Sequence, residues 1–338
     1  MTLIVAKMGT KTDFETAAAR VFSKIFGTQA HLEHCQRLSG GASQETWSLR
    51  GDGKRAILRR APGGVDTTTS STAIGLPSEA ALLSAVCEAG VPVPKIEYVL
   101  STEDGLGTGF VMAHVEGETI ARKILRDPQY AQAREGLARQ CGEALARIHA
   151  QARQTLPSTL RVSDAPTQLE EYEVIFRSFA VSRPIFELAF QVLKAHQPSP
   201  SETVLVHGDF RLGNLMVDTS GLVAVLDWEL AHLGDPREDL AWICVNSWRF
   251  GQRDQPVGGF GRLEDMLDAY QAAGGIAVPP SEVVWWELLG TLKWGIMCMI
   301  MYEAFRTGAD ASVERAAIGR RVSETEIDLI NLLEAHYA

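Results

Sequence analysis

The sequence predicts an α+β protein with two lobes, a small antiparallel sheet at the N-terminal end and a larger, mainly helical part after it. Three observations support this fold class. The chain has 338 residues, which is longer than a single hydrophobic core usually serves. Strand-like segments separated by glycine-rich turns are concentrated before Gly117. After Gly117, long stretches carry apolar residues at helical spacing.

The N-terminal part begins with an amphipathic helix, predicted over Asp13–Phe26 and ended by Gly27. Thr46–Arg50 and Lys54–Arg60 are β-type runs, and the Gly-Asp-Gly between them favours a tight hairpin because glycine accepts positive φ. The following residues, Ala61–Pro77, are rich in Gly, Thr, Ser and Pro, and we expect a mobile loop there.

Further elements follow in order along the chain. A helix is predicted over Ser78–Ala89 with its serine as the N-cap, and a strand over Gly109–Val115. A long amphipathic helix is predicted over Ala131–Arg153 and a second helical region over Glu170–His196. Val204–Val206 is predicted to be a short apolar strand, and the candidate catalytic residues follow it directly.

Composition excludes several classes of protein. Hydrophobic residues make up 46% of the chain and charged residues 22%, as in ordinary globular proteins. The formal net charge of −10 argues against a general nucleic-acid or membrane-surface binder. Charged residues interrupt the apolar segment Val283–Phe305, so a buried helix is predicted there and not a membrane span.

Cysteine usage favours a reducing cytoplasm. No CxxC pair occurs, and the N-terminus lacks the long apolar region of a secretory signal. We therefore predict buried free thiols at Cys35, Cys87, Cys141, Cys244 and Cys298.

The most informative segment follows the last predicted strand. Asp209 and Asn214 stand five positions apart on an expected loop, and a hairpin over residues 215–226 ends at Asp227. This order gathers a carboxylate, an amide oxygen and a second carboxylate at one strand end. Phosphoryl transfer needs such a set, because a carboxylate must accept the proton of the attacking hydroxyl and Mg²⁺ prefers oxygen ligands. The Asp-x₄-Asn spacing equals that of the protein-kinase catalytic loop.

Three motifs in order, HGDFRLGN, VLDWE and GDPREDLAW, resemble those of the aminoglycoside phosphotransferase family. That family shares the two-lobed protein-kinase-like fold with choline and homoserine kinases. The strings ILRRAPGG and HGDFRLGN are similar to the phosphotransferase-like domains fused to acyl-CoA dehydrogenases. The resemblance implies a nucleotide-binding lobe over residues 1–113 and a catalytic, substrate-binding lobe over residues 114–338.

The resemblance also assigns roles around the catalytic loop. It makes Asp209 the catalytic base and Asn214 and Asp227 the Mg²⁺ ligands, with Glu229 assisting. Asp239 is similar to a buried aspartate that accepts hydrogen bonds from the catalytic-loop backbone. The implied reaction moves the γ-phosphoryl group of ATP or GTP to a hydroxyl of a small molecule.

The nucleotide side is expected to be built from a glycine-rich turn and a strand end. Glycines let backbone N–H groups approach a triphosphate. The residues of this turn that we expect to contact the phosphates are Ser39, Gly40, Gly41 and Ser43. The resemblance also implies a hinge in which the backbones of Ala113 and Val115 face the adenine.

Arg59 occupies the position where most members of this fold carry a phosphate-binding lysine. Arginine is larger, always charged and prefers fork-like contacts. Its expected ion-pair partner is Glu79, and by strand alternation Arg60 is expected to be solvated on the opposite face. Arg211, two residues after Asp209, is expected either to stabilise charge on the transferring phosphate or to pair with a surface carboxylate.

The acceptor is expected to bind against the C-terminal helices, including Trp285–Phe305. This segment is rich in tryptophan and methionine and poor in acids, so it is either plain core or a wall suited to an acceptor with an apolar portion. A hydroxy acid or hydroxyacyl thioester fits such a wall better than an aminoglycoside, with Lys293 and Arg306 available for a carboxylate.

Two other classes stay open. A nucleotide-binding pseudokinase used for scaffolding or sensing would explain the arginine at position 59. A metal-dependent hydrolase would use the HGD sequence as one ligand cluster. Such enzymes usually gather several histidines, and in this sequence only His207 and His232 lie nearby.

Overall fold

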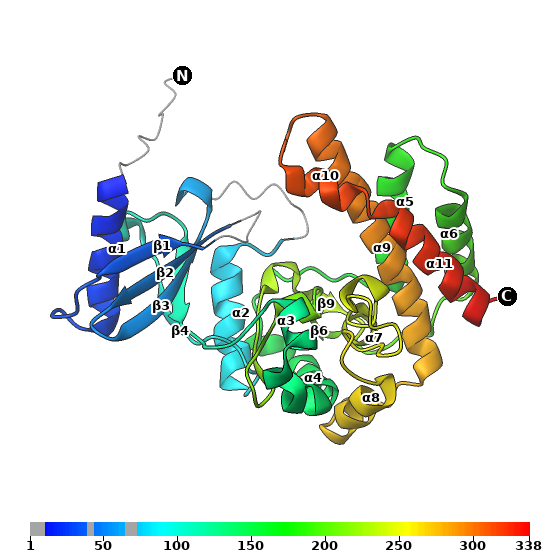
Figure 1. The fold of residues 1–338 in the computed structure, drawn as a ribbon, viewed down its shortest axis with the longest axis horizontal. Helices are drawn as coiled ribbons and strands as arrows, with labels where there is room; N and C mark the ends of the chain where they lie inside the picture. The colour runs from blue at the N-terminus through cyan, green and yellow to red at the C-terminus, as the bar shows by residue number, and fades with distance from the viewer. Residues whose placement is uncertain (1–10, 39–43, 65–72) are drawn as a thin grey trace. The chain divides into compact units, whose positions relative to one another are not determined.

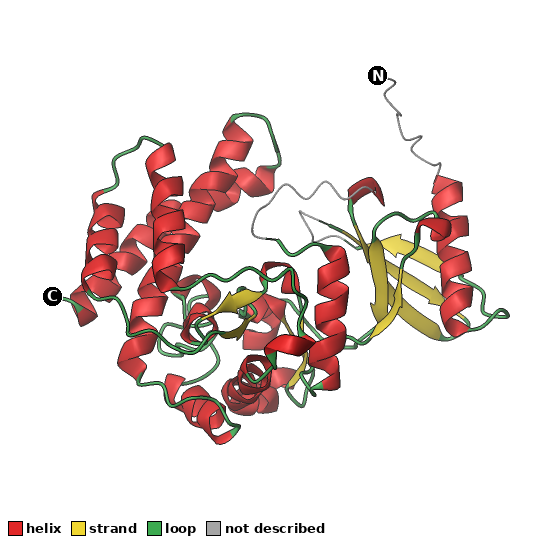
Figure 2. Cartoon of the chain, turned by 180° about the vertical axis from the view of Figure 1, so that it is seen from behind, coloured by secondary structure: helices red, strands yellow, loops and turns green. Residues whose placement is uncertain are grey.

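A computed structural model describes residues 11–38, 44–64 and 73–338 (Figure 1). The chain divides into two compact units. Unit 1 comprises Met1–Glu116, Gln154–Thr159 and Trp228–Leu230, and unit 2 comprises Gly117–Arg153, Leu160–Asp227 and Ala231–Ala338. Unit 1 holds a five-stranded sheet and unit 2 is mainly helical (Figure 2), so the α+β prediction is confirmed.

Unit 1 is an antiparallel sheet with a helix on each face. Its strand order is β1-β2-β3-β5-β4, and every neighbouring pair is antiparallel. The helices and strands of this unit are α1 (Lys11–Phe26), β1 (His34–Arg37), β2 (Glu45–Gly51), β3 (Lys54–Arg60), α2 (Leu76–Glu88), β4 (Ile96–Val99) and β5 (Gly109–Ala113). The predicted hairpin is confirmed, since Asp52 (φ 47°) and Gly53 (φ 70°) make the left-handed turn between β2 and β3.

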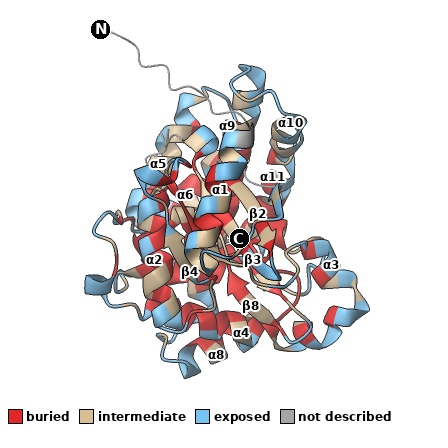
Figure 3. Ribbon diagram, turned by 90° about the vertical axis from the view of Figure 1, so that its left-hand side faces the viewer, coloured by how far each residue is buried: buried red, intermediate tan, exposed pale blue. Residues whose placement is uncertain are grey.

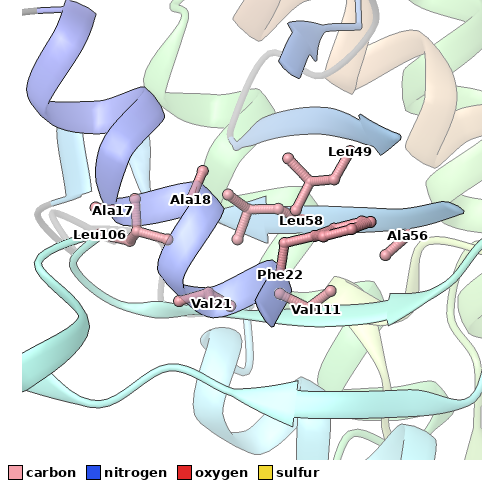
Figure 4. Packing of buried hydrophobic residues seen from close by; sticks show 9 residues of the cluster. All are labelled: Ala17, Ala18, Val21, Phe22, Leu49, Ala56, Leu58, Leu106 and Val111. Atoms are coloured by element: carbon pink, nitrogen blue, oxygen red, sulfur yellow. The ribbon is translucent and has the colours of Figure 1, made fainter. Parts of the chain in front are cut away.

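The core of unit 1 lies between α1 and the sheet, as Figure 4 shows. Phe22 of α1 is fully buried against Leu49 of β2 and Leu58 of β3. Burial of a side chain of this size is worth roughly 2–3 kcal/mol, so this contact secures β3 and with it the neighbouring site residues.

The prediction that Arg60 is solvated is wrong. Its Nε donates to Glu45 Oε2 at 2.7 Å, and its guanidinium carbon lies 4.4 Å from the ring centre of Phe14 in α1. Alternation does place Arg60 and Arg59 on opposite faces of β3. The face of Arg60, however, is covered by α1, which the strand pattern alone did not reveal.

The prediction that Ser78 caps α2 is also wrong. The helix begins at Leu76, two residues earlier, with Pro77 in its first turn and Gly75 (φ 76°) before it. Proline is favoured in the first turn because its missing N–H would have no helical partner there. The Ser78 hydroxyl instead lies 2.9 Å from that of Thr159. Of the predicted loop Ala61–Pro77, residues 65–72 lie outside the described residues, and Leu76 and Pro77 belong to α2.

Unit 2 contains most of the helices. Its elements are α3 (Ala121–Arg126), α4 (Ala131–His149), α5 (Ala165–Ser178), α6 (Pro184–Ala195), β6 (Val204–Val206), β7 (Leu215–Val217), β8 (Leu222–Val225), β9 (His232–Gly234), α7 (Arg237–Trp242), α8 (Leu263–Ala272), α9 (Pro280–Arg306), α10 (Val313–Gly319) and α11 (Val322–His336). The hairpin β7-β8 and the strand β6 are found where they were predicted. The helical region predicted over Glu170–His196 is confirmed, and it consists of α5 and α6, separated at Ala180 (φ 51°) and Pro184.

Helix α9 contains the strongly apolar C-terminal segment. It is long and apolar enough to cross a membrane by length and composition, but 83% of its most apolar window is buried inside the structure. Figure 3 shows the buried residues throughout the chain in red. Trp285 and Trp286 are buried core residues, and the indole of Trp285 donates to the Leu193 carbonyl oxygen of α6 at 3.1 Å.

The five cysteines are all free thiols, as predicted. Cys141, Cys244 and Cys298 are buried, and burial raises the pKa of each of these thiols, for Cys298 to about 12. Cys35 and Cys87 are only half-buried, which corrects the prediction for these two positions.

Candidate functional site

The loop after β6 is held by a buried carboxylate of α7. Asp239 is fully buried, and it accepts hydrogen bonds from the backbone N–H groups of His207 at 2.7 Å and Gly208 at 3.0 Å. Gly208 has φ 80°, a conformation that favours glycine. The predicted support role of Asp239 is therefore confirmed. A buried carboxylate that receives two N–H bonds fixes the loop backbone more firmly than solvent contacts would.

His149 and Tyr270 extend this support, and sequence reasoning assigned no role to these two residues. His149 at the end of α4 places Nε2 3.2 Å from Asp239 Oδ2 and Nδ1 2.9 Å from the hydroxyl of Tyr270 in α8. His207 is buried, and burial lowers the pKa of its imidazole despite the neighbouring acids. Its Nε2 lies 3.1 Å from the Leu226 carbonyl oxygen, so this histidine ties the loop to the end of β8.

The Asp209 carboxylate receives three side-chain donors. Asn214 Nδ2 donates to Oδ2 at 2.6 Å, and Trp242 Nε1 donates to Oδ1 at 2.7 Å. Arg211 Nε lies 3.0 Å from Oδ1 and 3.2 Å from Oδ2. The guanidinium carbon of Arg211 lies 4.8 Å from the ring centre of Trp248. The carboxylate is thus oriented by its neighbours, and the two tryptophans are site residues that sequence reasoning missed.

The salt bridge made by Arg211 differs from the one expected. Its partner is Asp209 itself, whose side chain is only 14% exposed, and not a surface carboxylate. The contact runs through Nε, the inner nitrogen of the guanidinium. This arrangement fixes the arginine beside the proposed base.

Asn214 and Asp227 fit a magnesium site by donor chemistry. Because the amide nitrogen of Asn214 donates to Asp209, its amide oxygen is directed away from that carboxylate. The N–H of Leu226 donates to the Asn214 carbonyl oxygen at 2.8 Å, which brings the next residue, Asp227, to the same loop. Asp227 has φ 66°, an uncommon conformation for a non-glycine residue and typical of functional positions. An amide oxygen and a carboxylate are ligands that Mg²⁺ prefers.

Among the described residues, no group of three or more His, Cys, Asp or Glu side chains is arranged to hold a metal ion. His232 lies 3.0 Å from Glu238 in a buried pair, so it belongs to the interior of unit 2.

In unit 1, Arg59 joins three side chains. Its Nη1 lies 3.2 Å from Glu79 Oε1, which confirms the predicted ion pair, and its Nη2 lies 3.8 Å from Glu229 Oε2. Its Nε donates to the side-chain oxygen of Gln44, and Gln44 Nε2 in turn lies 3.4 Å from Glu229 Oε2. Glu229 therefore contacts the arginine, and its role toward a metal stays a prediction.

The structure describes only some of the other residues predicted to bind the nucleotide. Ser39, Gly40, Gly41 and Ser43 lie outside the described residues. The N–H of Ala113 donates to the Lys95 carbonyl oxygen at 2.8 Å, so this N–H is already paired within unit 1. Val115 follows the end of β5.

The two cations considered for an acceptor carboxylate differ in their surroundings. Lys293 is buried, with its Nζ 3.2 Å from Glu238 Oε1. Arg306 is 60% exposed and pairs with Glu303 on the same helix.

Comparison with known proteins gives a consistent result. The profile of the phosphotransferase enzyme family (APH) matches residues 34–276. The chain is 33% identical over 215 residues to acyl-CoA dehydrogenase family member 10 of Mus musculus, covering 61% of this chain. It spans only 20% of the length of that relative.

Two solved structures share the fold. The structure of a putative aminoglycoside phosphotransferase from Ralstonia eutropha JMP134 has a TM-score of 0.75 and 19% identity, covering 96% of this chain and 99% of that one. The GDP complex of aminoglycoside 2'-phosphotransferase-IIIa has a TM-score of 0.69 and 16% identity, covering 95% of this chain and 99% of that one. The shared fold therefore covers nearly the whole chain, whereas the family profile matches residues 34–276.

Proposed function

The chain belongs to the phosphotransferase enzyme family, and we propose that it is a Mg²⁺-dependent small-molecule kinase. It transfers the γ-phosphoryl group of ATP or GTP to a hydroxyl of a small metabolite. The observation that carries this proposal is the loop of unit 2, where Asp239 fixes the backbone and Asp209 is oriented beside Asn214. The GDP bound in a solved structure of the same fold supports nucleotide binding.

In the proposed mechanism Asp209 binds the acceptor hydroxyl, orients it and accepts its proton. The bond from the hydroxyl oxygen to the γ-phosphorus forms as the bond from the γ-phosphorus to the leaving nucleoside diphosphate breaks. Orientation of reacting groups and general-base action each lower the barrier substantially. Arg211 is held at Asp209 and presents positive charge to the transferring phosphoryl group. Asn214 and Asp227 would hold Mg²⁺, which when bound neutralises phosphate charge.

Arg59 and Glu79 keep the ion pair that the fold usually makes with lysine. Arg59 would bind phosphate oxygens with its guanidinium fork. The pseudokinase alternative rests on this same arginine. The complete set of Asp209, Asn214 and Asp227 favours the kinase, because a protein that only binds nucleotide does not need the base.

The decisive experiment separates nucleotide binding from turnover with Asp209→Asn. Asparagine preserves the shape of the side chain and removes its charge. We expect ATP-Mg affinity by calorimetry within a few-fold of wild type, and turnover lower by about a hundredfold or more. Acceptor-stimulated ADP release with hydroxy acids, hydroxyacyl thioesters, amino alcohols, sugars and aminoglycosides supplies the turnover assay. Wild-type turnover in Asp209→Asn would contradict the proposal at its centre.

A further inference from the structure

An indole ring separates the proposed base from a buried ammonium group. Trp242 is 3% exposed and donates its Nε1–H to Asp209 Oδ1 at 2.7 Å. On the face of the same ring, Lys293 Nζ lies 5.0 Å from the ring centre, within the range of a cation–π contact. The lysine also lies 5.6 Å from the ring centre of Tyr172.

Lys293 is anchored by a second buried charge. Its Nζ lies 3.2 Å from Glu238 Oε1, and the other carboxylate oxygen of Glu238 lies 3.0 Å from His232 Nε2. Burial alone would raise the pKa of Glu238, but the charges of His232 and Lys293 lower it instead. Burial would likewise lower the pKa of Lys293, but Tyr172, Glu238 and Asp209 raise it. Both groups are therefore charged at neutral pH.

A buried ion pair needs an explanation other than stability. The cost of removing two charges from water often exceeds their attraction, and apolar residues of similar size commonly serve the fold as well. Lys293 lies on α9 and Glu238 on α7, and Glu238 also accepts a hydrogen bond from the side chain of Gln168. The feature that this pair adds is a fixed positive charge on the face of the ring that bonds to Asp209.

We propose that Trp242 is a positioning residue for Asp209, and that Lys293 strengthens it by polarising the indole N–H. The expected effect of Trp242 on kcat rests on the kinase function proposed above. A cation on the ring face draws electron density from the indole, so the N–H becomes a stronger donor. Trp242 donates to Oδ1, Asn214 donates to Oδ2, and Arg211 contacts both oxygens. Without the indole, the carboxylate loses one of the donors that fix its plane.

The hydrogen bond can be tested without any turnover. In ¹⁵N-indole-labelled protein, the Trp242 signal is identified as the one that disappears in Trp242→Phe. We expect this signal to move upfield in Asp209→Asn, because a charged acceptor becomes neutral. Trp47 serves as the control, since its indole donates to Glu45 at 3.2 Å in unit 1, and its signal should stay in place. A Trp242 signal that does not move in Asp209→Asn would overturn the proposal.

The contribution of Lys293 needs a variant that folds. Lys293→Met alone leaves Glu238 without its ammonium partner, so we pair it with Lys293→Met/Glu238→Gln, which removes both charges. In the double variant the Trp242 signal should again move upfield, by less than in Asp209→Asn. An unchanged signal in a folded double variant would overturn the assigned role of Lys293.

Kinetics then separates positioning from mere packing. Trp242→Phe keeps an aromatic ring and removes the donor, so kcat should fall about 10- to 100-fold, the range expected for a misplaced catalytic group, while KM for ATP changes less than about threefold. Trp47→Phe should leave both constants unchanged. If wild-type protein turns over and Trp242→Phe matches it, the positioning role fails and the kinase proposal stands. If wild-type protein fails to turn over any acceptor, the kinase proposal fails and the indole signals alone decide the positioning role.

Discussion

Arg59 and Arg60 are neighbours in β3 with opposite surroundings. Arg59 faces Glu79 of α2, and Arg60 faces Phe14 of α1. Alternation along the strand predicted that the two side chains diverge. It did not predict that both would be largely covered, each with 13% of its side chain exposed, because the helix that covers one face comes from a distant part of the sequence.

These two arginines provide a matched pair of variants. Arg59→Ala should weaken ATP-Mg binding about tenfold or more, because a charged hydrogen bond to phosphate is worth roughly 1.5–3 kcal/mol. Arg59→Lys should retain part of the affinity, since lysine keeps the charge but cannot reach Gln44, Glu79 and Glu229 together. Calorimetric titration with ATP-Mg measures both.

Arg60→Ala is the control for this pair. It should leave nucleotide affinity unchanged and lower stability by about 1 kcal/mol, through loss of the contacts with Phe14 and Glu45. Equal ATP-Mg affinity in wild type and Arg59→Ala would remove Arg59 from the phosphate site.

At the scale of elements, the support of the loop that carries Asp209 depends on a close helix crossing. Helix α4 supplies His149 and helix α8 supplies Tyr270, and the two side chains meet at 2.9 Å. Gly142 of α4 lies against the α8 backbone, where an added Cβ would stand 2.2 Å from the Met266 carbonyl oxygen and 2.9 Å from the Tyr270 nitrogen. The crossing therefore requires glycine at this position.

Gly142→Ala should destabilise the protein by about 1–3 kcal/mol, because backbone atoms cannot move aside as a flexible side chain can. Gly136→Ala, in the same helix, has only Gln140 Nε2 within 4 Å, at 3.9 Å. That control should be neutral or more stable by up to about 1 kcal/mol, from the higher helix propensity of alanine. Chemical denaturation compares the two, and equal stability would show that α4 and α8 adjust their spacing.

Elements encoded by neighbouring residues were the predictable ones. The hairpin at Asp52 and Gly53 and the Asp209–Asn214 spacing are each readable within a few positions. The donor Trp242 follows Asp209 by 33 residues, and no spacing rule links an indole to a carboxylate at that distance. The predicted start of α2 was wrong because Pro77, which is favoured in the first turn of a helix, places the start before the expected cap Ser78.

At the scale of the whole molecule, the residues proposed for phosphate binding and those proposed for metal binding and catalysis belong to different compact units. Arg59 and Glu79 are in unit 1, and Asp209 and Asp227 are in unit 2. These two pairs are neighbours neither in the sequence nor in the folding unit. Only the family motifs linked them before the structure was known, which is why the nucleotide and catalytic roles could be assigned together.

The stabilisation of the full chain by bound nucleotide and Mg²⁺ tests this division of roles between the two units. A ligand that binds only the folded state at a hundred times its Kd stabilises the protein by about 2.7 kcal/mol, which corresponds to a rise in Tm of about 4 °C for a chain of this size. We expect this rise with ATP or GTP plus Mg²⁺, and loss of most of it when EDTA removes the metal. Asp227→Ala should lose the Mg²⁺-dependent part, because the fold of the β7-β8 hairpin does not depend on that carboxylate.

Asp209→Asn is the control for the linkage experiment, because the base contacts the acceptor and not the nucleotide. It should keep the full rise in Tm while losing turnover. A rise in Tm in wild-type protein without turnover of any acceptor would instead identify a pseudokinase. Absence of a rise in Tm with either nucleotide would contradict both the kinase proposal and the pseudokinase alternative, since both require the nucleotide to bind.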